Sequence, residues 1–263
     1  IQACGMSFSQ NDLNRKHTPE ETCEKARDAT VVIAGTEDLS LLVETSDSLR
    51  MISRVGIGLD GVPLSRCKEK GIVVTWTPDA VTAAVAELTL GLMISCSRSI
   101  SANHSRLRKG QWQRSIDKGL SDSTIGLVGF GRIGKAVAEL LIPFQPNSIL
   151  VTDVRSISEE VEIFKRGQLN VSEAPLDQII AESDIVSLHV PLWSATKNLI
   201  GRSELSKMKS GSFLINTARG GIVDEEALYQ SLQIGHMGGA ALDVFSTEPY
   251  HGALIECDNV VLT

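Results

Sequence analysis

Residues 129–134 read GFGRIG, and the apolar run TIGLV stands directly before them at 124–128. After this stretch, apolar residues recur at the spacing of a helix. In a strand–turn–helix of this kind, Gly129 permits a tight turn, Gly131 lets a pyrophosphate approach the backbone, and Gly134 lets the helix pack closely on the strand. The unpaired N–H groups at the start of the helix favour phosphate. The stretch therefore predicts a dinucleotide site.

An acidic residue stands where such a site meets the ribose. Asp153 follows the next apolar run, 148–152, and a carboxylate there can accept hydrogen bonds from ribose hydroxyls. The same charge would repel a 2′-phosphate, which favours NAD over NADP. Arg155 keeps the NADP alternative open, because a guanidinium turned inward could bind that phosphate. We expect Arg155 to be solvated instead.

The second part of the chain alternates between apolar runs and helical or polar segments. This alternation predicts βαβ units and an α/β fold with a doubly wound parallel sheet of the Rossmann type, buried on both faces. The six apolar runs, which we expect to be strands, are residues 124–128, 148–152, 184–190, 212–218, 239–245 and 259–263.

The first part of the chain has a different texture. Short apolar runs at 31–34 and 71–76 are separated by polar segments, which suggests a small α/β unit. The best candidate hinge is Thr77-Pro78-Asp79, so we expect domains at residues 1–78 and 79–263. Asp79 is expected to cap a helix that runs to about Arg98 and bridges the domains.

Composition excludes several classes of protein. With 25 Lys+Arg and 32 Asp+Glu the net charge is −7, so no nucleic-acid or membrane partner is expected. The basic residues around Trp112 do not change this expectation; they are Arg106, Arg108, Lys109 and Arg114. The five cysteines show no C-x-x-C pairing, so we expect no metal site and a reducing, cytoplasmic location.

Three clusters of polar and glycine residues, at 216–221, 241–244 and 247–249, lie at the ends of expected strands. In an open α/β sheet, ligands bind beyond the carboxyl ends of the strands, so these clusters should line one crevice. Arg219 comes directly after an apolar run, where a guanidinium needs an anionic partner. That partner is either a substrate carboxylate, held by two hydrogen bonds, or an internal acid such as Glu248 or Asp243.

Several of these segments together resemble the D-isomer-specific 2-hydroxyacid dehydrogenases, most closely the 3-phosphoglycerate dehydrogenase branch. The similarity covers the chain from about Val31 onward. It implies a nucleotide-binding domain inserted into a split, flavodoxin-like substrate domain, of which this chain holds part. The matching segments are RVGIGLDGVPL (54–64), VAELTLGLM (85–93), GFGRIG (129–134), DIVSLHVPL (184–192), INTARGGIVDEEAL (215–228) and GAALDVFSTEP (239–249).

The resemblance implies a set of residues that bind NAD. Among them, Asp243 would contact the nicotinamide carboxamide, and Thr77 would sit against the nicotinamide from the hinge. The full set of implied cofactor-binding residues is Thr77, Gly129, Gly131, Arg132, Ile133, Gly134, Asp153, Val190, Thr217, Ala218, Arg219 and Asp243.

The resemblance also implies substrate-binding and catalytic residues. Arg219 would hold the substrate carboxylate and polarise the reacting carbonyl. Glu248 would hydrogen-bond a catalytic histidine and raise its pKa. Arg54 and the backbone N–H groups of Gly56 and Ile57 would receive the substrate from the other domain.

The pattern departs from the family at the ends of the chain. The family's catalytic histidine lies in a P-H-x-G segment after the strand that here reads NVVLT, so we expect it beyond Thr263 and expect family members to extend past both ends. His189 matches a family histidine near the cofactor that carries no proton, and we expect a structural role for it.

The resulting expectation is an NAD-dependent oxidoreductase that transfers hydride at C2 of a small D-2-hydroxy acid. The resemblance puts 3-phosphoglycerate, and hence serine biosynthesis, first, and glyoxylate or hydroxypyruvate second. An NAD(H)-sensing, corepressor-like binding protein without turnover is the alternative class. The resemblance also implies a homodimer or a higher homo-oligomer.

Overall fold

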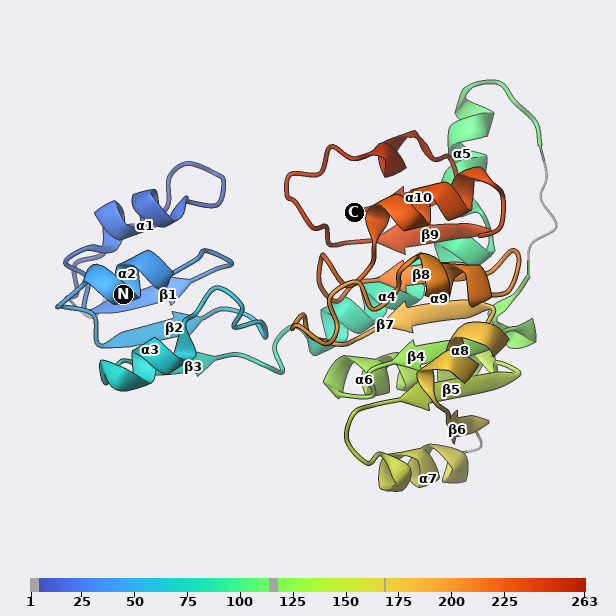
Figure 1. The fold of residues 1–263 in the computed structure, drawn as a ribbon, viewed down its shortest axis with the longest axis horizontal. Helices are drawn as coiled ribbons and strands as arrows, with labels where there is room; N and C mark the ends of the chain where they lie inside the picture. Colours follow the sequence, from blue (N-terminus) through green and yellow to red (C-terminus); the bar gives the residue numbers. More distant parts are fainter. Residues whose placement is uncertain (1–4, 114–117, 168) are drawn as a thin grey trace. The chain divides into compact units, whose positions relative to one another are not determined.

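The structure is a computed structural model that describes residues 5–113, 118–167 and 169–263 (Figure 1). The chain forms two compact units, Ile1–Val81 and Thr82–Thr263. The assignment of substrate binding to the first and cofactor binding to the second remains a proposal.

The first unit is a small parallel sheet with short helices and a core of its own. Its strand order is β1-β2-β3. The middle strand is absent from the sequence-based prediction, because only Ile52 of its four residues is buried and its polar end reads as a loop. The elements are β1 (Val31–Ala34), β2 (Met51–Arg54), β3 (Val73–Trp76), α1 (Pro19–Ala26), α2 (Ser40–Thr45) and α3 (Leu64–Glu69).

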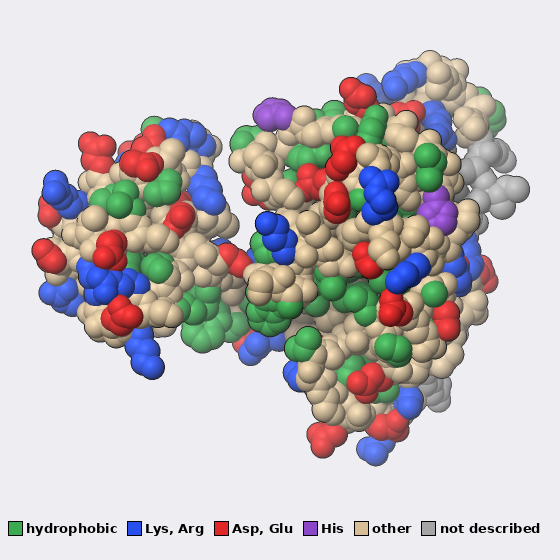
Figure 2. All heavy atoms as spheres, viewed as in Figure 1, with side chains coloured by type: hydrophobic (Ala, Val, Ile, Leu, Met, Phe, Trp, Pro, Cys, Tyr) green, Lys and Arg blue, Asp and Glu red, His purple; other side chains and the backbone are tan. Residues whose placement is uncertain are grey.

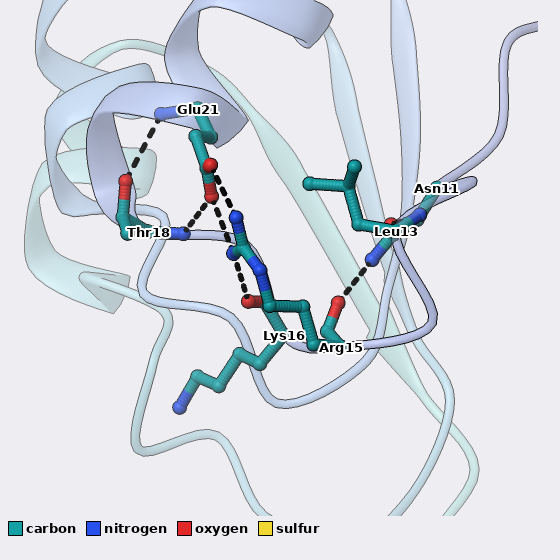
Figure 3. A network of polar contacts seen from close by, with 6 residues as sticks. All are labelled: Asn11, Leu13, Arg15, Lys16, Thr18 and Glu21. Atoms are coloured by element: carbon teal, nitrogen blue, oxygen red, sulfur yellow. Dashed lines mark hydrogen bonds and ion pairs between the residues drawn. The ribbon is translucent and has the colours of Figure 1, made fainter.

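Helix α1 begins at Pro19 because the residues around it satisfy its first N–H groups (Figure 3). The Thr18 hydroxyl accepts from the Glu21 N–H at 3.3 Å, and the Glu21 carboxylate accepts from the Thr18 N–H at 2.9 Å. This reciprocal pair is a capping box. Arg15 donates two hydrogen bonds to Glu21, at 2.7 and 2.6 Å. The Arg15 guanidinium and the Thr18 N–H lower the pKa of Glu21 to about 2.

The second unit contains a parallel sheet of strand order β10-β9-β8-β7-β4-β5-β6. All six expected strands are present, and the doubly wound fold is confirmed. A seventh, β6, was missed because it is a three-residue edge strand with one buried side chain. The strands are β4 (Thr124–Val128), β5 (Ser148–Thr152), β6 (Val171–Glu173), β7 (Ile185–Leu188), β8 (Phe213–Asn216), β9 (Gly239–Leu242) and β10 (Val260–Leu262).

Helices cover both faces of this sheet, as expected. Successive side chains of β5 alternate: Ile149 and Val151 pack in one apolar cluster with α4, α6 and α7, whereas Leu150 packs in the other with α8, α9 and α10. The helices are α4 (Thr82–Ser97), α5 (Ile100–Arg108), α6 (Arg132–Leu141), α7 (Ser158–Arg166), α8 (Leu176–Glu182), α9 (Arg202–Lys207) and α10 (Glu225–Gln233), with short 3-10 turns at Leu120–Asp122, Ile142–Phe144 and Ala253–Glu256.

The long helix differs from its prediction at its start and agrees with it at its end. It begins at Thr82 rather than directly after Asp79, and it ends at Ser97. Ser99 has a φ of 48°, in the left-handed region, and the next helix leaves at an angle of 59°. In the described part of the chain, no single helix is long and apolar enough to cross a membrane, and only the bent pair α4 and α5 meets the length and composition together.

Two residues considered above, Cys4 and Arg114, lie outside the described residues. The described cysteines are free thiols, and burial raises the pKa of Cys96 to about 12.

Arg106 and Arg108 lie in the last turn of α5, where cations interact favourably with the helix carbonyls. Acidic and basic side chains are interspersed over the visible face of the molecule (Figure 2). Arg106 and Arg108 thus have an explanation within their own helix.

Candidate active site

The carboxyl ends of six strands of the second unit form one row. The register pairs Thr152 with Val128, Val128 with Leu188, Leu188 with Asn216, Asn216 with Leu242 and Leu242 with Leu262. The next residue of each strand therefore lies along one edge of the sheet, which we call the carboxyl edge. In sheet order these residues are Asp153, Gly129, His189, Thr217, Asp243 and Thr263.

The topology places a crevice at this edge. The chain runs from β4 outward to β5 and β6, and then returns to β7 on the other side of β4 (Figure 1). At such a switch point, the connections leave β4 and β7 in opposite directions, and ligands bind between them. The glycine loop follows β4 and Val190 follows β7, so predicted cofactor residues flank the crevice from both sides.

The three glycines of the loop face different surroundings. Gly129 has a φ of 95°, and a Cβ there would lie 2.6 Å from the His189 carbonyl oxygen. A Cβ at Gly134 would overlap the Gly129 carbonyl oxygen, so the start of α6 packs tightly on the loop. A Cβ at Gly131 would meet no described atom within 4 Å. Gly129 and Gly134 are therefore required by packing, whereas Gly131 borders open space that fits the approach of a pyrophosphate. The helix begins with Arg132 and Ile133, beside this space.

Replacing Gly131 by alanine should separate binding from stability. The φ of Gly131 is −79°, which any residue adopts, so we expect the free energy of unfolding to stay within about 0.5 kcal/mol of wild type. The added methyl group would stand where the pyrophosphate approaches the backbone, so the Kd for NADH should rise at least about tenfold. Fluorescence titration with NADH measures this change.

Gly91 offers the matched control, because a Cβ there also meets no described atom within 4 Å. It lies within α4, so Gly91→Ala should keep the affinity for NADH and leave stability equal or slightly higher. Wild-type NADH affinity in Gly131→Ala would contradict the placement of the pyrophosphate.

Asp153 holds the glycine loop as well as facing the expected ribose position. Its carboxylate accepts from the Phe130 N–H at 2.9 Å and from the Arg155 N–H at 3.2 Å. The Phe130 ring is fully buried and contacts the ring of Phe164, with centroids 5.5 Å apart. The carboxylate is thus fixed at the end of β5, next to the turn that would receive the phosphates.

Arg155 is not the solvated side chain that the sequence suggested. Its guanidinium donates to the Phe130 carbonyl at 2.9 Å and to Glu160 at 3.0 Å, and it lies 3.6 Å from Asp153. The side chain is half-exposed, yet acids and a carbonyl hold it close to the loop. The expectation missed this because Glu160 lies in the next helix, where sequence spacing does not reveal the contact.

The loop after β8 is held by two side chains that carry no implied role. The buried Asn216 donates to the Arg219 carbonyl at 2.9 Å and accepts from the Ala218 N–H at 3.1 Å. The Thr217 hydroxyl lies 2.8 Å from the hydroxyl of Thr89, which is fully buried in α4. Thr89 was missed by the sequence reasoning, although a hydroxyl on the buried side of a helix is a signal for such a contact.

The structure brings Arg219, Asp243 and Glu248 into adjoining loops. A Cβ at Gly220, next to Arg219, would overlap the Phe245 carbonyl oxygen, so the loops after β8 and β9 touch. Glu248 is exposed and accepts from the Phe245 N–H at 3.2 Å, while Asp243 accepts from the Thr263 hydroxyl at 2.9 Å. Arg219 is half-buried and donates to the carbonyl of Ala218 at 2.6 Å.

The remaining predicted residues lie together in the first unit, at the carboxyl ends of β2 and β3. Arg54 ends β2, and its guanidinium donates to the Val55 carbonyl. The Gly56 N–H donates to the Thr77 hydroxyl at 2.9 Å, and the Thr77 N–H donates back to the Gly56 carbonyl at 3.3 Å. The Gly56 N–H is therefore already bonded, and a substrate would have to displace Thr77 to use it. Ile57 follows in the same loop.

His189 lies behind the glycine loop with a buried ring. Both ring nitrogens are inaccessible to solvent and have no hydrogen-bond partner among the described residues. Burial lowers the pKa of His189 from 6.5 to about 4, so the imidazole is neutral near pH 7. These properties favour a packing role for His189.

In the described ranges, no group of three His, Cys, Asp or Glu side chains could hold a metal ion.

Comparison with known proteins settles the family. Residues 90–263 match the model of the D-isomer specific 2-hydroxyacid dehydrogenase, NAD binding domain. The chain belongs to this family. A hydroxypyruvate reductase of Thermotoga maritima is 40% identical over 242 residues, which are 90% of this chain and 76% of the relative.

Two further relatives bear on the family's range. A D-3-phosphoglycerate dehydrogenase of Methanocaldococcus jannaschii is 36% identical over 94% of this chain, which spans about half of that relative (47%). The solved structure of a D-lactate dehydrogenase of Aquifex aeolicus, complexed with NAD and lactic acid, is 30% identical, with a TM-score of 0.80 over 91% of this chain and 77% of that one. Membership in this family of oxidoreductases confirms NAD as the cofactor and 2-hydroxy acids as the substrate class.

Proposed function

We propose that the intact protein reduces a small, unphosphorylated 2-keto acid, hydroxypyruvate or glyoxylate, with NADH. The observation that carries this proposal is the carboxyl edge, where the glycine loop, Asp153, Thr217 and Asp243 lie in one row. The hydroxypyruvate reductase that is 40% identical supports the choice of substrate. The resemblance to phosphoglycerate dehydrogenases keeps a competing proposal, the oxidation of 3-phosphoglycerate to 3-phosphohydroxypyruvate and its reverse.

The proposed chemistry divides between the cofactor and the protein. When bound, NADH supplies the hydride. Arg219 would hold the substrate carboxylate and donate to the carbonyl oxygen as negative charge develops there. Glu248 would hold the imidazole of the proton carrier in its charged form. Thr217 and Asp243 would orient the carboxamide of the nicotinamide. The contacts of Asn216 and Thr89 support the proposed role of Arg219, because they fix the loop that carries it.

A substrate panel tests the proposal. The loss of NADH absorbance is followed with hydroxypyruvate, glyoxylate and 3-phosphohydroxypyruvate, and kcat/KM is compared. We expect the two unphosphorylated acids to be preferred. A higher kcat/KM for the phosphorylated acid would replace the proposal by a phosphoglycerate dehydrogenase of serine biosynthesis. Tight NADH binding without turnover of any acid would favour an NAD(H)-sensing protein.

The apolar surface of α5 supports a second proposal, that the chain forms a homodimer or a higher homo-oligomer. Ile100 and Leu107 of α5 are 52% and 56% exposed, and Trp112, in the segment that follows α5, is 74% exposed. Large exposed apolar side chains that form a patch mark interaction surfaces. Light scattering of the purified protein should therefore give a multiple of the single-chain mass. A single-chain mass at micromolar concentration would reject the proposal.

A further inference from the structure

A four-residue ionic cluster lies next to the expected ribose position. Glu160, in the first turn of α7, accepts from Arg155 at 3.0 Å and lies 3.8 Å from the Lys135 ammonium. Arg155 lies 3.6 Å from Asp153 in turn. Two cations and two acids thus balance one another in a cluster whose acids are largely buried, with exposed fractions of 22% for Glu160 and 13% for Asp153.

The contacts of Arg155 account for all three nitrogens of its guanidinium. One terminal nitrogen donates to Glu160, the other donates to the Phe130 carbonyl at 2.9 Å, and Nε faces Asp153. A guanidinium binds a phosphate through the same N–H groups. A phosphate at the ribose would therefore compete with Glu160 for the charge and the N–H groups of Arg155.

The chemistry of the two dinucleotides makes this arrangement selective. The 2′-phosphate of NADP adds nearly two negative charges where NAD has a hydroxyl, so NADP needs a nearby cation that is not already neutralised. We propose that Glu160 is a specificity-determining residue, which withholds Arg155 and Lys135 from a 2′-phosphate and so disfavours NADPH in addition to the repulsion from Asp153. This inference rests on the proposed ribose contact of Asp153.

Glu160 is ionised at neutral pH, as the proposal requires. Its own backbone N–H and the Arg155 guanidinium lower the pKa of its carboxyl. The cations in the two ion pairs to be broken, Arg155 and Lys135, are 49% and 35% exposed, and ion pairs open to solvent are individually weak. Neutralising Glu160 should therefore release the two cations without unfolding α7.

The experiment compares the dissociation constants of NADH and NADPH, measured by the fluorescence of the reduced nicotinamide, for wild type and Glu160→Gln. We expect NADPH to bind about tenfold more tightly in the variant and NADH to change less than about twofold. Adding Arg155→Gln to this variant should remove the gain, because Arg155 is the nearer cation. Glu160→Ala serves as a second variant.

Glu162→Gln is the matched control. Glu162 lies on the same helix, carries the same charge and pairs with Lys165 at 2.7 Å, within α7 itself. We expect no change of cofactor preference in this variant. Equal effects of the two glutamate substitutions on NADPH would show a general effect of net charge and overturn the proposal. An unchanged NADPH affinity in Glu160→Gln would overturn it too, as would an equal loss of both affinities, which would make Glu160 a support of the loop only.

Asp153→Asn separates this inference from the function on which it rests. We expect this variant to weaken NADH binding, because the amide is a poorer acceptor for ribose hydroxyls. Unchanged NADH affinity would refute the ribose contact of Asp153. A loss of NADH affinity here, together with no effect of Glu160→Gln on NADPH, would refute only the role of Glu160.

Discussion

Replacing Arg219 by lysine should lower kcat/KM for the 2-keto acid by about a thousandfold. The proposed contact uses the planar fork of the guanidinium, which holds a carboxylate through two parallel hydrogen bonds, and an ammonium cannot reproduce it. The lysine would also place its charge farther from the carbonyl oxygen, where removal of one donor costs on the order of 10²–10³ in rate. Steady-state kinetics with NADH and hydroxypyruvate measure the effect.

The surrounding loop should survive this substitution. Asn216 holds the loop through the backbone carbonyl of residue 219 rather than through the guanidinium, so the melting temperature should change little. The matched control is Arg202→Lys, on α9, where the arginine hydrogen-bonds Gln230. Its kcat/KM should equal that of wild type. Equal kinetics of the two variants would remove Arg219 from the proposed chemistry.

The stability of the protein should fall as the pH is lowered from about 6.5 to 4, because of His189. The folded-state pKa of His189 is about 4, below its ordinary value of 6.5, so the unfolded chain binds a proton in this range that the folded chain does not. The stability gained from the neutral imidazole is complete above pH 6.5 and is lost as the pH falls. At about 1.4 kcal/mol per pH unit, the loss amounts to about 3 kcal/mol.

Urea unfolding at several pH values measures this slope, and two histidine variants identify its origin. His189→Asn removes the titrating ring, so part of the slope should disappear, although the protein becomes less stable at pH 7. The same substitution at His104, which is exposed on α5, should keep the full slope. A slope that persists unchanged in His189→Asn would assign the pH dependence to other groups.

The accuracy of the strand predictions followed how continuous the apolar run is in each strand's own sequence. The strands β4, β5, β7, β8 and β9 have three or more buried residues each, and their apolar runs were recognised. The strands β1, β3 and β10 bury one residue or none, yet their runs VVIA, VVTW and VVL were recognised too. The strands β2 and β6 read MISR and VSE, where polar residues interrupt the apolar run, and both were missed. A short strand is held by its neighbours in the sheet, and those neighbours are distant in the sequence.

The candidate site was predictable at positions where the backbone geometry allows only one residue type. Gly129 and Gly134 stand where a side chain would collide with the backbone, and the GFGRIG spacing reveals this locally. Thr89 and Glu160 were not predicted as members of the site. Thr89 reaches Thr217 across 128 positions of sequence, a contact that depends on how α4 packs on the sheet.

The sequence by itself determined the parallel sheet, the dinucleotide site and the residues that follow each strand, because hydrophobic periodicity and glycine spacing are local properties of the chain. The resemblance of its motifs to known proteins indicated the family. Only the tertiary structure decided which charges neutralise one another beside the cofactor. The sequence predicted that Arg155 is a solvated cation, yet Asp153, Glu160 and the Phe130 carbonyl hold its guanidinium. The partners of a charge depend on its neighbours in space, and here the packing of α7 beside the glycine loop brought them together.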